Sequence, residues 1–128
     1  MGWFILAWTR AAEFTGRSRR KEYWMFQLFN ILVGVAIAMA ALLIGGKGGL
    51  NTFAFSLCAY GLVSFVPSLS CMVRRLHDTG RSGWWYFIGF VPLIGGIVLM
   101  VFMVLDSDPD RNEYGPNPKL PGPPGVIV

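Results

Sequence analysis

Residues 23–44 read YWMFQLFNILVGVAIAMAALLI and contain no Asp, Glu, Lys or Arg. Two further stretches share this property: TFAFSLCAYGLVSFVPSLSCMV at 52–73 and WWYFIGFVPLIGGIVLMVFMVL at 84–105. A helix of about 22 residues is about 33 Å long, enough to cross a hydrocarbon core of about 30 Å. No stretch alternates with the period of a strand. The sequence therefore predicts an all-α integral membrane protein with three transmembrane helices.

The overall composition agrees with a membrane location. Of the 128 residues, 54% are hydrophobic and only 14% are charged, whereas a typical soluble domain has about 25% charged residues. This balance disfavours a disordered chain, a nucleic-acid-binding tail and an ordinary soluble enzyme. Two cysteines and one histidine are too few for a four-ligand zinc site or a multi-histidine centre. We therefore expect no metal and no cofactor.

The ends of the chain differ from the three apolar stretches. Residues 3–14 place apolar side chains on one helical face, which predicts a short N-terminal interfacial helix. Beyond residue 105 the chain is rich in proline, which predicts an irregular C-terminal tail. We assign residues 1–120 to a single membrane domain and residues 121–128 to a flexible tail.

The basic residues predict an orientation in the membrane. Eight of them precede the first apolar stretch or separate the second from the third: Arg10, Arg17, Arg19, Arg20, Lys21, Arg74, Arg75 and Arg81. The other flanks carry Lys47, Arg111 and Lys119. The positive-inside rule then places the N-terminus and the 74–83 loop in the cytoplasm, and the C-terminal tail in the periplasm. The aromatic residues Tyr23, Trp24, Trp84 and Trp85 are expected to be interfacial anchors at the cytoplasmic side.

Few polar or helix-breaking residues lie inside the apolar stretches. Gln27 and Asn30 share a helical face, and we expect them to make interhelical hydrogen bonds. A polar transport path is the alternative, but such paths usually need ionisable groups at mid-depth. Pro67 predicts a kink in the second stretch, and Pro92 with the glycines at 95–96 predicts a kink or local unwinding in the third.

The chemistry-bearing residues flank the membrane in two motifs, FTGRSRRKEYW at 14–24 and RRLHDTGRSGWW at 74–85. Their arginines are expected to bind anionic lipid headgroups or a membrane partner, because guanidinium groups bind phosphate in a bidentate way. The candidate site comprises Arg17, Arg19, Arg20, Arg74, Arg75, His77, Asp78 and Arg81. A second interpretation is that these arginines only fix topology and folding. A third gives His77 and Asp78 an acid–base role, but no catalytic constellation accompanies them.

The two motifs, followed by NEYGPNP at 112–118, resemble one family in this order, the bacterial domain-of-unknown-function 805 family. The resemblance covers about residues 3–120, and the RRLHD segment is its most specific mark. It implies a small multi-pass protein of the bacterial inner membrane and implies no activity. The matching motif positions are Gly16, Arg17, Arg20, Glu22, Tyr23, Trp24, Arg74, Arg75, His77, Asp78, Gly83, Trp84, Asn112, Tyr114, Gly115 and Pro116.

The segment DSDPD at 106–110 departs from the glycine-rich sequence that is usual there in the family. Its alternating carboxylates resemble the start of an EF-hand loop. However, Arg111 and Asn117 stand where the loop needs glycine and the bidentate glutamate. A solvated acidic linker is the expected structure.

These observations favour a non-enzymatic interaction protein of the bacterial inner membrane whose cytoplasmic arginine motifs bind anionic lipid or a partner, with self-association through small-residue faces. Two alternatives remain open at this stage. One is a component of an oligomeric transporter or channel. The other is a membrane enzyme that acts on a phosphorylated lipid through His77 and Asp78.

Overall fold

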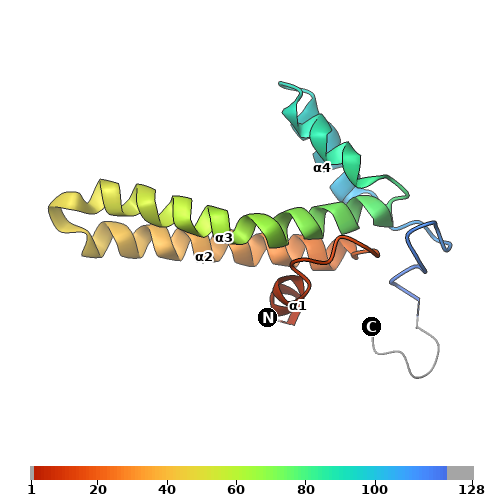
Figure 1. Ribbon diagram of the computed structural model, residues 1–128, viewed down its shortest axis with the longest axis horizontal. Helices are drawn as coiled ribbons and strands as arrows, with labels where there is room; N and C mark the ends of the chain where they lie inside the picture. The colour runs from red at the N-terminus through yellow and green to blue at the C-terminus, as the bar shows by residue number, and fades with distance from the viewer. Residues whose placement is uncertain (1, 121–128) are drawn as a thin grey trace.

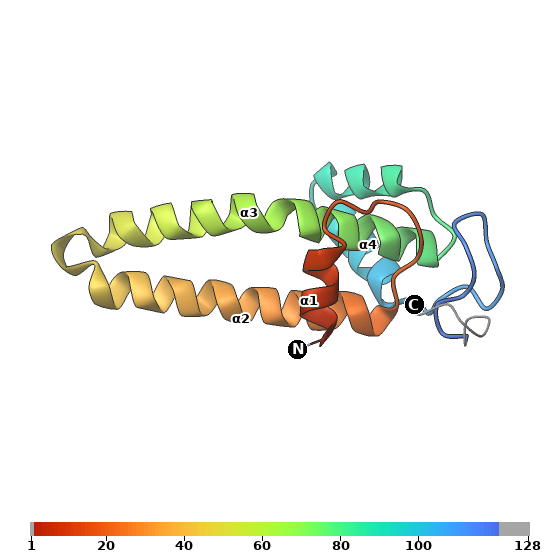
Figure 2. The same cartoon turned by 60° about the horizontal axis from the view of Figure 1, so that its bottom comes forward.

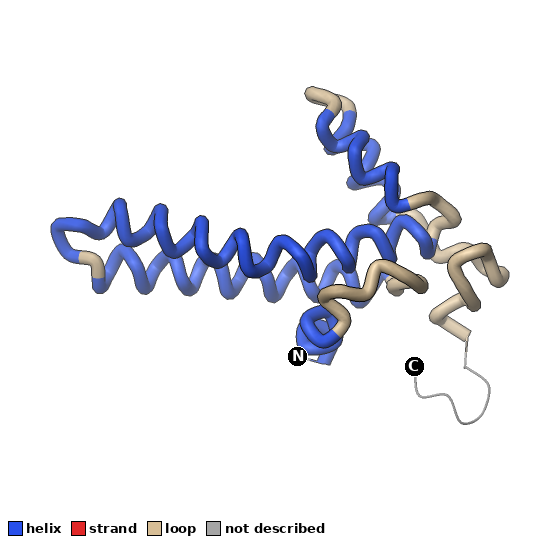
Figure 3. The backbone as a smooth tube through the Cα atoms, viewed as in Figure 1, coloured by secondary structure: helices blue, strands red, loops and turns tan. Residues whose placement is uncertain are grey.

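The computed structural model describes residues 2–120, apart from the side chain of Trp3, so the predicted flexible tail at 121–128 lies outside the described residues. The described chain forms helices and loops and contains no strand beyond an isolated bridge between Asn112 and Gly115 (Figure 3). The predicted all-α class is therefore confirmed.

Two long helices form an antiparallel hairpin that dominates the molecule (Figure 1). They are α2 (Arg20–Ile44) and α3 (Gly49–Asp78), joined at one end by the short helix η1 (Gly46–Gly48). Their most apolar windows have mean hydropathies of 2.3 and 1.6, so both helices are long and apolar enough to cross a membrane. Two of the three predicted spans are therefore present as continuous helices, and α3 continues through Pro67.

The contact between α2 and α3 uses the small and polar residues of the first apolar stretch. A Cβ added at Gly34 would lie 3.8 Å from the ring of Tyr60, so the missing side chain lets the two helices approach closely. The Tyr60 hydroxyl donates a hydrogen bond to the side-chain oxygen of Asn30. The predicted interhelical hydrogen bond of Asn30 is thus confirmed, with its partner on α3.

The N-terminal helix α1 (Gly2–Thr9) is shorter than the predicted 3–14 helix. It lies across the α2–α3 hairpin near the start of α2 (Figure 2). Ala7 is fully buried there, and the ring of Phe4 stacks on Phe26 with centroids 5.8 Å apart.

The third apolar stretch is not one continuous helix, so the third predicted span is not confirmed. It forms two short antiparallel helices, η2 (Gly83–Phe90) and α4 (Gly95–Val104), which we call the short hairpin. A Cβ added at Gly95 would lie 1.8 Å from the carbonyl oxygen of Ile88, so only glycine permits this crossing. The predicted unwinding at the proline and glycines is therefore a complete reversal of the chain.

The reversal returns the tail to the end of the molecule where α2 begins and α3 ends (Figure 2). There Arg17 donates hydrogen bonds to the carbonyls of Asp108 and Asp110, and the Asp108 N–H donates to the carbonyl of Asp78. The prediction that the tail and the arginine motifs lie on opposite sides of the membrane is therefore wrong. A single crossing helix would separate them, whereas a hairpin brings both ends back to one side.

Candidate functional site

Three segments distant in sequence meet where α3 ends. They are the loop before α2, the end of α3 and the tail. The end of α3 is fixed by a left-handed glycine, since Gly80 has φ +73°. The N–H groups of Gly80 and Arg81 donate to the carbonyls of His77 and Leu76, at 3.0 and 2.9 Å. This pairing is a Schellman motif, which stops the helix and turns the chain sharply.

Asp78 is the centre of what we call the polar cluster, which comprises Arg17, Arg75, Asp78 and Ser107. The Asp78 side chain is fully buried. One carboxylate oxygen accepts from Arg17 Nε at 2.9 Å. The other accepts from Arg75 Nη1 and from the Ser107 hydroxyl. A single buried carboxylate therefore serves two guanidinium groups, which is how a charge is tolerated away from water.

Arg17 joins the tail to the end of α3, and it is only 6% exposed. Besides its ion pair with Asp78, its two terminal nitrogens donate to four carbonyl oxygens. These belong to Asp78 at 3.2 Å, Asp108 at 2.8 Å, Asp110 at 2.9 Å and Gly115 at 3.3 Å. All five guanidinium N–H groups are thus used inside the protein.

The C-terminal end of α4 is capped by side chains of α2 and α3. Arg20 donates to the carbonyl of Val104 at 3.0 Å, Trp24 Nε1 to that of Met103 at 3.3 Å, and Arg75 to those of Met103 and Leu105. Cationic donors at this end satisfy the last carbonyls and oppose the negative end of the helix dipole. The short hairpin is therefore anchored to α2 and α3 at its base.

Arg74 points to the other side of α3, toward the loop before α2. It is fully buried and pairs with Glu22 at 3.0 Å. Its Nε and Nη2, together with Ser18 Oγ and Trp8 Nε1, have no hydrogen-bond partner among the described residues. The Ser18 N–H donates to the Arg74 carbonyl at 3.1 Å, which ties the loop to α3.

His77 packs within the protein. Its ring stacks on Tyr114 with centroids 3.9 Å apart and planes 1° apart. Its Nδ1 lies 3.2 Å from the carbonyl oxygen of Gly16, and since a carbonyl only accepts, Nδ1 is the protonated nitrogen. Asn112 Nδ2 donates to the His77 carbonyl at 2.9 Å. With both oxygens of Asp78 occupied, these contacts favour a structural role for His77 and Asp78 over acid–base chemistry.

The remaining basic candidates lie nearer the surface. Arg20 and Lys21 are exposed and Arg19 is half-buried. Arg81 lies over the ring of Phe102 on α4, 4.1 Å from its centroid, a cation–π contact. The candidate site is therefore divided into a buried set with internal ion pairs and an outer set nearer the surface.

The four aromatic residues predicted as interfacial anchors differ in how exposed they are. Tyr23 is 5% exposed and belongs to the core, so it does not face the surroundings of the protein. Trp24, Trp84 and Trp85 are exposed by 42%, 78% and 45%. Their anchoring role remains a prediction.

The sequence missed the tail residues of the polar cluster. The 106–110 segment is not simply a solvated linker, because Ser107 is buried on Asp78 and the carbonyls of Asp108 and Asp110 accept from Arg17. The Asp106 and Asp110 side chains are exposed, and a hydrogen bond from Lys119 lowers the pKa of the Asp106 carboxyl. Arg17 binds backbone carbonyl oxygens of the tail, which every residue type has, so no sequence motif could have predicted these contacts. Between residues 2 and 120, no group of three or more His, Cys, Asp and Glu is placed to hold a metal ion.

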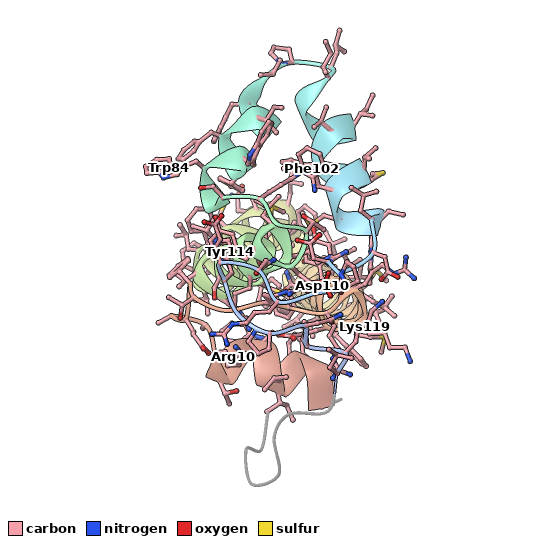
Figure 4. The ribbon with its side chains drawn as sticks, turned by 90° about the vertical axis from the view of Figure 1, so that its right-hand side faces the viewer. Arg10, Trp84, Phe102, Asp110, Tyr114 and Lys119 are labelled. Atoms are coloured by element: carbon pink, nitrogen blue, oxygen red, sulfur yellow. The ribbon has the colours of Figure 1, made fainter. Side chains whose placement is uncertain are left out.

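The charges gather at one end of the α2–α3 hairpin. Apart from Lys47, the acidic and basic residues lie in three segments of the sequence: 10–22, 74–81 and 106–119. Figure 4 looks onto this end, with Arg10, Asp110, Tyr114 and Lys119 around the ends of the two long helices.

The same motifs connect the chain to known proteins. The family model described as "Protein of unknown function (DUF805)" matches residues 11–116. The chain belongs to the DUF805 family. It is 41% identical over 120 residues to inner membrane protein YhaI of Escherichia coli (strain K12), and 38% identical over 125 residues to inner membrane protein YhaH of the same strain. Both alignments cover 94% of this chain and 98% of the relative.

A shorter similarity extends to the uncharacterized protein YiiR of the same strain. The two are 33% identical over 80 residues, which is 62% of this chain and 50% of that protein. No solved structure matches the chain. The names of YhaI and YhaH give a membrane location, and none of the three names gives an activity.

Proposed function

We propose that this DUF805 protein is a non-enzymatic interaction protein of the bacterial inner membrane that binds anionic lipid headgroups at the cytoplasmic face. The observation that carries the proposal is the division of the basic residues at one end of the molecule. Arg17, Arg74 and Arg75 are buried and form ion pairs inside the protein. Arg19, Arg20 and Lys21 stand at the start of α2, next to the exposed Trp24.

Orientation is the first part of this proposal. With the tail returned by the short hairpin, ten of the eleven basic residues lie at one end, and Lys47 alone lies at the other. The positive-inside rule counts Lys and Arg and gives little weight to acidic residues. This bias supports a cytoplasmic location for both the N-terminus and the tail, with the η1 turn in the periplasm.

Headgroup binding is the second part. A basic residue near an anionic membrane surface contributes about 1 kcal/mol, or about fivefold in affinity. Arg19, Arg20 and Lys21 are consecutive at the first turn of α2, where the helix would leave the hydrocarbon. Trp24 is one turn further along and supplies an amphipathic ring suited to the headgroup level.

Orientation is tested with C-terminal reporter fusions. A fluorescent-protein fusion is expected to fluoresce and an alkaline phosphatase fusion to be inactive, because both reporters would be cytoplasmic. The reverse pattern would return the tail to the periplasm and refute this topology. A fusion inserted at Gly46–Gly48 is the internal control, since it should give the opposite pair of signals.

Lipid binding is tested by native mass spectrometry of protein reconstituted in vesicles of phosphatidylglycerol and phosphatidylcholine. The wild-type protein is expected to retain phosphatidylglycerol preferentially, and the double variant Arg19→Gln, Lys21→Gln to lose most of that preference, while Arg20, which caps α4, is left in place. Lys47→Gln removes a charge at the other end and should retain it. Unchanged retention in a folded double variant would refute headgroup binding by this segment.

A further inference from the structure

Helix α1 lies beside the charged half of the α2–α3 hairpin. The ring centroid of Phe4 lies 5.8 Å from that of Phe26 and 6.0 Å from that of Phe29. These two α2 residues follow Glu22, the last charged residue of the helix, by about one and two turns. Both belong to the apolar stretch at 23–44. α1 is therefore level with the part of α2 that lies just inside the hydrocarbon when α2 and α3 cross the membrane.

The short hairpin packs on α3 over the same half of the molecule. A Cβ added at Gly83 would lie 2.9 Å from the side chain of Val73, and Tyr86 lines one crevice with Phe65. Both α3 residues belong to the half of the apolar stretch at 52–73 that adjoins the charged end. Figures 1 and 2 differ by a rotation about the long axis, and in both the short hairpin stays over the charged half of the α2–α3 pair, although it leans away from it.

The other half of the α2–α3 hairpin has no such companions. Among residues 2–120, only α2, α3 and η1 reach it (Figures 1 and 2). Large apolar side chains are exposed there on both helices, among them Leu43, Leu50 and Phe55. The described chain is therefore two helices wide at one end and wider at the other.

α1 and the short hairpin extend from opposite sides of the α2–α3 pair. Figure 4 looks along the pair and shows α1 below it and the short hairpin above it. Residues 2–9 and 83–105 include no charged residue, and the large side chains that they expose are apolar, as at Ile5, Phe90 and Ile97. A helix without a polar face is stable in an apolar environment and not in water. Both elements therefore belong to the apolar layer of the membrane.

We propose that this protein is a wedge in the membrane, which displaces more lipid from the leaflet at its charged end than from the other leaflet. A helix is about 10 Å wide, so the 8 residues of α1, which lie across the pair, add about 120 Å² at this end. This area is about the cross-section of one more crossing helix, and the short hairpin adds to it on the opposite side. The asymmetry belongs to the single chain and does not depend on what covers the reversal at 91–94.

A wedge of this shape favours a curved membrane. In a flat bilayer the leaflet at the wide end is the more crowded one, and bending the membrane so that this leaflet is convex gives the additional area room. In the proposed orientation the wide end lies in the cytoplasmic leaflet. The protein should therefore gather where the inner membrane is convex toward the cytoplasm.

The test measures how the protein distributes between a narrow membrane tube and the giant vesicle from which the tube is pulled. The vesicle is made of phosphatidylcholine and contains no anionic lipid. A dye is attached at Lys47→Cys in a Cys58→Ala background, because Lys47 is exposed at the η1 end and Cys71 is fully buried. A membrane-impermeant quencher added outside leaves the signal of those molecules whose η1 end faces the lumen and whose charged end faces outward.

The outer leaflet of the tube is convex. Molecules with the charged end outward are therefore expected to be denser in the tube than in the vesicle by about twofold or more. Molecules in the opposite orientation, obtained from the signal lost on quenching, are expected to be depleted from the tube. The two orientations of one protein thus control for each other, and this comparison needs no destabilised variant.

Two variants assign the effect to the wide end. Deletion of residues 2–9 should lower the enrichment, because it removes the area of α1. Leu43→Ala combined with Ile44→Ala trims exposed side chains at the narrow end and should retain it. Folding of the deletion variant is checked with trypsin, which should cleave after Arg111 no sooner than in the full chain.

Equal density of both orientations in tube and vesicle overturns the proposal, and so does enrichment of the opposite orientation. Unchanged enrichment in the folded deletion variant also contradicts it, because α1 would then displace no lipid. The inference rests on the membrane insertion in the proposed function but not on headgroup binding. A failure to retain phosphatidylglycerol leaves the expected result in phosphatidylcholine unchanged, whereas a periplasmic tail in the reporter fusions would remove the short hairpin from the wide end.

Discussion

Replacement of Asp78 by Asn tests whether the polar cluster holds the fold. The variant keeps the shape of the side chain but removes the carboxylate that pairs with both Arg17 and Arg75. Its new amide N–H₂ also faces donors, either Arg17 Nε or the group formed by Arg75 Nη1 and the Ser107 hydroxyl. Breaking a buried ion pair by removing one partner costs about 3–5 kcal/mol, because the other charge stays buried without compensation.

That loss is large against the total stability of a domain, about 5–15 kcal/mol. The matched control is Asp106→Asn, whose carboxylate pairs with Lys119 at the surface, with side chains exposed by 63% and 43%. A surface pair contributes about 0–1 kcal/mol, so this variant should unfold almost as the wild type does. Both variants remove one negative charge from the same end of the molecule, so net charge cannot explain a difference between them.

The assay is equilibrium unfolding in mixed micelles with increasing sodium dodecyl sulfate, followed by tryptophan fluorescence. Asp78→Asn should unfold at a clearly lower fraction of the denaturing detergent than Asp106→Asn. Under native conditions its tail should be released, so trypsin should cleave after Arg111 sooner than in wild-type protein. If Asp78→Asn unfolds within about 1 kcal/mol of wild type, the polar cluster does not hold the fold and the reasoning fails.

Further predictions concern the second buried ion pair and the short hairpin. Glu22→Gln leaves the buried Arg74 without a counter-charge and should cost about 3 kcal/mol or more in the same unfolding assay; a loss below 1 kcal/mol would contradict this. Glu13→Gln should cost less than about 1 kcal/mol. The hydrogen bond from the partly exposed Arg10 lowers the pKa of Glu13. The small contribution of this pair to stability is therefore fully present above the ordinary pKa of a glutamate, and it disappears as the pH falls through the lowered pKa of Glu13. Gly95→Ala should disrupt the short hairpin. Gly96→Ala should be tolerated, because a Cβ at Gly96 meets nothing within 4 Å. Equal yields and equal unfolding of the two variants would contradict the close contact between Gly95 and Ile88.

The motif residues illustrate what a sequence pattern conveys about a site. The pattern placed Arg17, Arg74, Arg75 and Asp78 at one membrane face, and the structure does bring them together. It did not distinguish a guanidinium with internal partners from one that is open to a ligand. That distinction depends on carbonyl groups of the tail, 91 to 98 residues from Arg17 along the chain.

The sequence by itself determined the apolar α2–α3 hairpin and the gathering of arginines beside it. Both follow from local physics: long uncharged stretches are stable in hydrocarbon only as helices, and charged side chains stay outside it. Only the tertiary structure decided that the third apolar stretch reverses at 91–94. Hydropathy is the same for a helix that crosses and for a hairpin that returns. The outcome depends on whether the end of α4 and the tail find partners, and Arg17, Arg20 and Arg75 provide those partners from distant parts of the chain.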